Sequence, residues 1–151
     1  MSKTVAEIII LIPSVLYTGY LLFVAGVVQN IMNKLDEATF QRFLNLLDQT
    51  ATRSPYAIIV GSLTFIGMFP YFIFYGFNNW WYTAGLIVFV IASIVSKSLN
   101  LPIYKRVSSI NSSDTALLNK ERRKLQSSNR VRAVVQFISM ALMTIGLIYG
   151  L

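Results

Sequence analysis

The chain has 151 residues, of which 55% are hydrophobic and 13% charged, and its formal net charge is +7. A soluble domain carries about 25% charged residues, so this balance indicates an integral membrane protein. The sequence contains no cysteine and no histidine, which excludes disulfides, thiolate nucleophiles, iron–sulfur clusters and the usual zinc, copper and haem ligands. We therefore expect neither a metal site nor a resident cofactor.

Four apolar segments are long enough to cross a bilayer as helices, which takes about 20 residues each. The expected spans are residues 8–28, 56–77, 81–101 and 131–151 of a single membrane domain, 1–151. After the first span, Asp36 is placed to cap an amphipathic helix. The apolar face of this helix holds Phe40, Phe43, Leu44 and Leu47. The expected fold is all-α: an antiparallel four-transmembrane-helix bundle with an amphipathic segment after the first span, lying on the membrane surface or against the bundle.

The second and third spans are joined by residues 76–79 alone, which predicts a helical hairpin. Aromatic residues surround this turn: Phe69, Tyr71, Phe72, Phe74, Tyr75, Phe77, Trp80, Trp81 and Tyr82. Tyr and Trp favour the headgroup level of a membrane, so an aromatic belt is the leading interpretation, and an aromatic substrate pocket is the alternative. Beyond the third span, Pro102 removes the helical hydrogen bond to the carbonyl of Ser98, and a kink or helix end is expected there.

The basic residues predict the topology. All Lys and Arg residues except Lys3 fall on the side of the first and third loops, residues 29–53 and 102–130. Positively charged loops face the cytoplasm, so both termini should lie outside, in our interpretation across a bacterial inner (plasma) membrane. Within the second of these loops, residues 108–128 are expected to form a short helix or an ordered loop. The excess positive charge is assigned to anionic lipid headgroups rather than to nucleic acid.

Polar side chains recur inside the spans at helical spacing: Thr18 in the first, Ser96 and Asn100 in the third, and Asn129, Arg132 and Gln136 in the fourth. Such groups are costly in a membrane and face the protein interior or a cavity. One interpretation is helix packing through small and polar residues. The other is a polar cavity near the cytoplasmic end, between the third and fourth spans. An inward-facing Arg132 would need an acceptor there, either an amide or an anionic or phenolate ligand.

Two short motifs carry a family resemblance. Residues 100–104 read Asn-Leu-Pro-Ile-Tyr, and residues 129–132 read Asn-Arg-Val-Arg at the start of the last span. These motifs and the layout of the spans resemble the anthrone oxygenase-like family of small four-helix membrane proteins. The family pattern is Asn-x-Pro-[Leu/Ile]-Asn and then Trp-x-x-x-Asn-x-x-Arg. Its conserved positions correspond to Asn100, Pro102, Asn129 and Arg132, whereas Tyr104 and Leu125 stand where the family has Asn and Trp. Many members also have His where this chain has Arg130.

Members with an assigned activity oxidise polycyclic anthrones to anthraquinones with dioxygen, without metal or flavin. The resemblance therefore implies a small hydrophobic or aromatic ligand, with Arg132 stabilising a substrate anion and with Asn100 and Asn129 orienting substrate or dioxygen. The expected cavity-lining residues are Tyr104, Gln136, Ser96 and Thr18.

The altered motif positions leave open whether the protein is an enzyme. The alternative is a non-catalytic subunit or scaffold of a larger membrane complex, or a homo-oligomer. A transporter or channel ranks last, because the spans lack the internal repeats and intramembrane charge that secondary transporters show.

Overall fold

The computed structural model describes residues 1–150, and every regular element in that range is helical. The elements are α1 (Lys3–Phe23), a π-helical turn η1 (Val24–Val28), α2 (Gln29–Lys34), α3 (Glu37–Arg53), α4 (Pro55–Tyr75), α5 (Trp80–Ser109) and α6 (Thr115–Tyr149). This confirms the all-α class.

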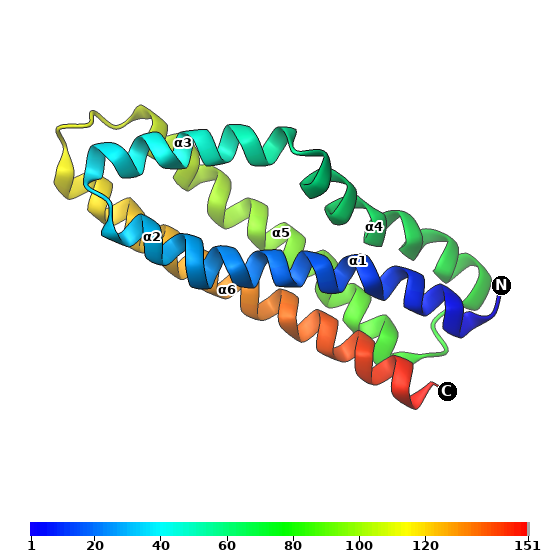
Figure 1. The fold of residues 1–151 in the computed structure, drawn as a ribbon. Helices are drawn as coiled ribbons and strands as arrows, with labels where there is room; N and C mark the ends of the chain where they lie inside the picture. The colour runs from blue at the N-terminus through cyan, green and yellow to red at the C-terminus, as the bar shows by residue number, and fades with distance from the viewer. Residues whose placement is uncertain (151) are drawn as a thin grey trace.

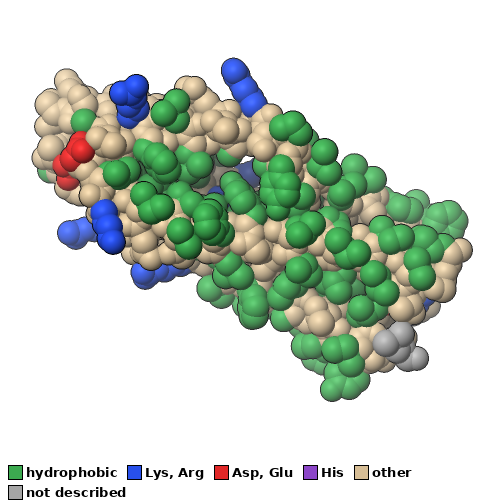
Figure 2. Space-filling view, in the orientation of Figure 1, with side chains coloured by type: hydrophobic (Ala, Val, Ile, Leu, Met, Phe, Trp, Pro, Cys, Tyr) green, Lys and Arg blue, Asp and Glu red, His purple; other side chains and the backbone are tan. Residues whose placement is uncertain are grey.

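Within residues 1–150, four helical stretches are long and apolar enough to cross a membrane: Lys3–Lys34, Pro55–Tyr75, Trp80–Ser109 and Thr115–Tyr149. The first joins α1, η1 and α2 end to end. Figure 2 shows hydrophobic side chains spread over most of the face in view, with Lys and Arg side chains gathered toward the end where α2 and α3 lie. Large apolar side chains such as Ile73 and Phe74 on α4 are more than three-quarters exposed. A soluble protein rarely exposes so broad an apolar surface, so the fold supports an integral membrane protein.

The helices pack side by side in an elongated molecule whose two termini lie at the same end (Figure 1). α5 packs along α6, and α1 packs against both α6 and α4. α4 packs against α1 rather than along α5. The rings of Phe65 on α4 and Phe89 on α5 nevertheless contact each other, with centroids 5.1 Å apart. The turn at residues 76–79 joins α4 to α5, and Gly76 ends α4 with a φ of 63°, a conformation that suits glycine. Because α4 does not pack along α5, a pocket lies between these two helices.

α3 forms as the sequence predicts. The Asp36 side chain caps it by accepting a hydrogen bond from the backbone N–H of Thr39 at 2.9 Å, and these hydrogen bonds with Thr39 lower the pKa of the Asp36 carboxyl. Phe40 and Leu44 are completely or almost completely buried. They pack with residues of α2, α5 and α6, namely Met32, Ile103, Val107, Leu118 and Leu125. The amphipathic helix therefore lies against the other helices.

The helices run further than the hydropathy of the sequence indicates. α5 does not end at Pro102 but continues to Ser109. Residues 115–130 belong to the segment expected to hold a short helix or an ordered loop before the last span, and they form the first turns of the long helix α6. The connection between α5 and α6 is only residues 110–114. The reason is packing: Ile103 and Val107 bury one face of the extended α5 against Leu118 and Leu125 of α6. That burial outweighs the one backbone hydrogen bond that Pro102 removes.

The aromatic residues around the hairpin include an exposed group and a buried pair. Phe69, Phe74, Phe77 and Trp80 are about two-thirds or more exposed, as in a membrane-facing belt. Tyr71 and Tyr82 are buried, with their ring centroids 5.2 Å apart. The predicted belt therefore surrounds a buried pair of tyrosines.

Candidate functional site

A network of polar side chains joins three helices near the end of the molecule where the Lys and Arg side chains gather, which we call the basic end. The Asn100 amide on α5 donates to Asn129 on α6 at 3.2 Å, and the Asn129 amide donates to Gln29 on α2 at 2.8 Å. The Ser128 hydroxyl donates to the Asn100 side-chain oxygen. All four side chains are buried. Because each buried amide is matched by a partner, this network fixes the position of Asn100 against α6.

A pocket of about 230 Å³ adjoins this network. Its polar lining side chains come from α1 (Tyr17, Tyr20), α3 (Asp48, Thr52), α5 (Ser96, Lys97, Asn100, Tyr104) and α6 (Arg132). Figure 2 shows a hollow in the surface between α3 and α1, and a basic side chain is visible within it. The pocket thus combines two cationic side chains, one carboxylate and several hydroxyls.

Arg132 is the distinctive residue of this pocket. Only 9% of its surface is exposed, and its Nε atom has no hydrogen-bond partner within residues 1–150. A buried guanidinium N–H without an acceptor is costly, since it has lost its water and gained no hydrogen bond in exchange. The arrangement therefore favours an acidic or strongly accepting group in the pocket beside Arg132.

The structure brings some of the predicted site residues together and separates others. Arg132, Asn100, Tyr104 and Ser96 line the same pocket. Asn129 lies behind Asn100 and holds it in place. Two further predicted lining residues lie outside the set that lines this pocket: Thr18, whose hydroxyl donates to the Ser14 carbonyl at 2.7 Å, and Gln136, which is fully buried with both amide atoms unpaired in the described chain.

Five polar residues of the pocket were not anticipated from the sequence: Tyr17, Tyr20, Asp48, Thr52 and Lys97. A signal for Asp48 existed, because it lies four residues after Leu44 and therefore on the inward face of α3. Tyr17 and Lys97 carried no comparable signal, since their contribution depends on how α1, α3 and α5 are placed in space.

A larger space of about 630 Å³, with Lys97 as the one charged side chain among the described residues that line it, borders the polar pocket. The two share the lining residues Tyr17, Thr52, Ala57, Ser96 and Lys97. The larger space extends between α4 and α5, where Gly61, Phe65, Val90 and Ile94 line it. A ligand with an acidic group near Arg132 would find room for an apolar body here.

A second polar centre lies at the opposite end, near the termini. Glu7 of α1 is almost completely buried, and its Oε1 accepts from the hydroxyl of Tyr71 at 2.7 Å and from the amide of Asn79 at 2.9 Å. Lys3 lies 3.9 Å from the same oxygen. The Tyr82 hydroxyl donates to the Glu7 backbone carbonyl at 2.7 Å. Since these donors come from α4, the hairpin turn and α5, this centre joins the ends of the helices.

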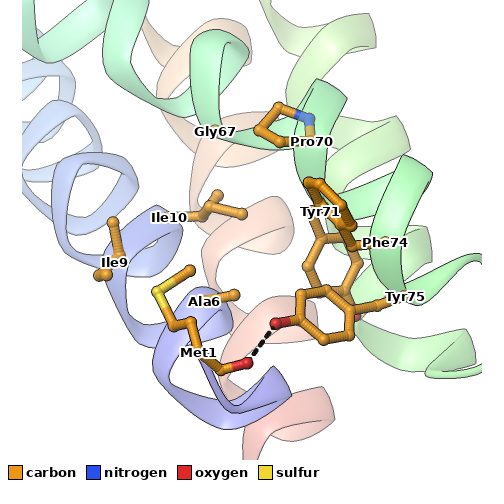
Figure 3. Close-up of a pocket in the computed structure, with 9 residues that line it drawn as sticks. All are labelled: Met1, Ala6, Ile9, Ile10, Gly67, Pro70, Tyr71, Phe74 and Tyr75. Carbon is orange, nitrogen blue, oxygen red and sulfur yellow. Dashed lines mark hydrogen bonds between the residues drawn. The ribbon is translucent and has the colours of Figure 1, made fainter.

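Beside this centre is a pocket of about 530 Å³, and Figure 3 shows the side chains around it. Ile9, Ile10, Pro70 and Phe74 make most of it apolar, and the Tyr75 hydroxyl donates to the Met1 carbonyl at 2.7 Å across its rim. None of the described residues that line this pocket has a cationic side chain, so the pocket offers little to an acidic ligand. We therefore regard the pocket of Arg132 as the candidate functional site.

No family model, curated protein or solved structure matches this chain. The interpretation of the site accordingly rests on its geometry and on the motif residues.

Proposed function

We propose that the protein crosses the membrane as an antiparallel bundle of four helices and binds a small amphipathic molecule in the pocket of Arg132. The observation that carries the proposal is the buried guanidinium whose Nε lacks a partner inside a pocket. The acidic or phenolic group of the ligand would pair with Arg132, and its hydrophobic or aromatic body would occupy the adjoining space between α4 and α5.

The proposed topology places the basic end in the cytoplasm and both termini outside, in a bacterial inner membrane. The natural absence of cysteine allows a direct test with single-cysteine variants. We expect a membrane-impermeant maleimide to label Ser2→Cys on intact cells or spheroplasts, and to label Ser113→Cys only after permeabilisation. Both positions are exposed, so access to the reagent depends on the side of the membrane. The reverse labelling pattern would contradict the orientation.

A cofactor-independent oxygenase reaction is the proposed chemistry. An anthrone methylene would react with dioxygen to give the quinone carbonyl and one water. Arg132 would stabilise the anion formed when the methylene loses a proton, Asp48 would supply a carboxylate to accept that proton, and Asn100 would hold the ligand while Asn129 fixes Asn100. This proposal is supported by the motif resemblance and by the meeting of Arg132, Asp48 and Asn100 at one pocket.

The test uses the purified protein in detergent, titrated with a polycyclic anthrone. Anthrone binding and oxygen consumption are both recorded during the titration. We expect Arg132→Ala to weaken binding about 10- to 100-fold, because a hydrogen bond to a charged group contributes about 1.5–3 kcal/mol. The matched control is Arg130→Ala, which removes the same charge from an exposed position two residues away. Equal binding by wild type and Arg132→Ala would refute the assigned site, and binding without oxygen uptake would refute the oxygenase reaction alone.

The second candidate is a non-catalytic subunit or scaffold of a membrane complex. The closed network of Gln29, Asn100, Ser128 and Asn129 favours it, because these side chains satisfy one another without a ligand. In that case a stoichiometric partner protein should co-purify, whereas a protein that purifies alone with a bound small molecule would count against it.

A further inference from the structure

A groove of about 450 Å³ between α5 and α6 has a chemistry different from that of the Arg132 pocket. Its lining includes Ser98 and Pro102 on α5, and Lys124 and Ser127 on α6. The charged residues are clustered toward the basic end, and Leu99 and Val131 belong to the apolar part of the groove. The groove therefore lies where the apolar stretches of both helices give way to their charged ends.

Two cations at the groove are held by one carboxylate. Glu121 accepts from Arg106 at 2.9 Å and from Lys124 at 2.6 Å. The ionised carboxylate is almost fully buried, whereas the side chains of Arg106 and Lys124 are about half exposed. The groove therefore presents net positive charge and free N–H donors outward.

Pro102 adds an acceptor to these donors. Proline has no N–H, so the carbonyl of Ser98, four residues earlier, lacks its usual helical partner. Ser98 lines the groove, and so does Ser127, whose side chain is exposed. A ligand that carries both an anion and a hydroxyl would find a complement for each here.

The apolar part of the groove continues down the outer surface of the two helices. Leu99 and Val131 are each about 40% exposed, and Val134 further along α6 is more than half exposed. Such side chains suit the acyl chains of a lipid whose headgroup lies beside Arg106 and Lys124.

We propose that this groove binds the headgroup of an anionic phospholipid with a hydroxylated head, with its phosphate against Arg106 and Lys124 and its hydroxyls near Ser98 and Ser127. The site rests on the proposed membrane insertion but not on the function of the Arg132 pocket. The lipid site and ligand binding in the Arg132 pocket can be tested separately, because Arg132→Ala should leave lipid binding intact.

The test is native mass spectrometry of the whole protein in detergent, titrated with phosphatidylglycerol. Lys124→Gln should weaken binding about fivefold, since one basic residue near anionic lipid contributes about 1 kcal/mol. Glu121→Gln should strengthen binding, because it removes the carboxylate that partly neutralises both cations. Lys105→Gln is the matched control: it removes the same charge from an exposed position next to Arg106 that is not part of the groove lining, and it should bind like wild type.

Three results would overturn the site. Equal losses of lipid affinity in Lys124→Gln and Lys105→Gln would mean that the lipid is held by general electrostatic attraction and not by a specific site. Unchanged affinity in Lys124→Gln would show that the phosphate lies elsewhere. Binding of glycerol 3-phosphate as tight as that of phosphatidylglycerol would identify a site for a soluble phosphate compound instead of a lipid.

Discussion

Replacing Glu7 with alanine is expected to lower the stability of the protein more than any other change to a polar side chain. The substitution removes the acceptor for the buried hydroxyl of Tyr71, and an unsatisfied buried donor costs about 1–3 kcal/mol. It also removes one acceptor of the Asn79 amide and leaves a cavity among α1, α4 and α5, which adds to the loss. The thermal unfolding midpoint in detergent measures the effect.

Two further variants separate the hydrogen bond from the carboxylate charge. Glu7→Gln keeps a side-chain oxygen as acceptor, so it should lose much less stability than Glu7→Ala. Tyr71→Phe removes the donor instead. The double variant Glu7→Ala with Tyr71→Phe should lose less stability than the sum of the two single variants, because no buried donor or acceptor of this hydrogen bond is then left without a partner. Strictly additive losses would mean that the bond at 2.7 Å contributes nothing to stability.

Replacing Gly146 with alanine is the second change with a large expected effect. Gly146 lies where α6 crosses the start of α5, and a Cβ atom there would meet the backbone nitrogen of Tyr82 and come within 2.7 Å of its Cα. These are backbone atoms, so the helices themselves must separate, and overpacking of this kind costs about 1–3 kcal/mol. We expect a lower thermal midpoint and a weakened hydrogen bond from Asn79 to the Gly146 carbonyl, now 2.9 Å.

The control for Gly146→Ala is Gly19→Ala. A Cβ at Gly19 meets nothing within 4 Å, and alanine is favoured over glycine in a helix by about 1 kcal/mol. Gly19→Ala should therefore leave the thermal midpoint unchanged or raise it. If both variants behaved alike, the close approach of α5 and α6 at Gly146 would not be a determinant of stability.

The sequence predicted the parts of the fold that depend on local pattern. Apolar length predicted the four long helices, and the spacing of Phe40 and Leu44 after Asp36 predicted α3. The prediction from sequence was wrong where tertiary packing determines the structure, as at Pro102. The hydropathy of the third span falls off there, yet α5 continues because Ile103 and Val107 are buried against α6. Hydropathy measures the preference for lipid, and it does not report burial against another helix beyond the membrane.

The site was predictable to a similar degree. Helical spacing on α6 selected Arg132 and Asn129 as residues of one face, and both are buried. Gln136 shares that face but is fully buried among the packed helices and lies outside the set of pocket-lining residues. Glu7 was missed as a central residue for a different reason. Its importance comes from donors on Tyr71 and Asn79, more than 60 residues away in the chain, and no local pattern connects them.

The most direct test of the central claim is native mass spectrometry of the protein extracted gently from its own membrane, with wild type and Arg132→Ala compared side by side. We predict that a small molecule with an acidic or phenolic group accompanies the wild type and is lost from Arg132→Ala, while Arg130→Ala retains it. A stoichiometric partner protein in both samples, with no small molecule in either, would contradict the claim and assign the buried polar residues to assembly.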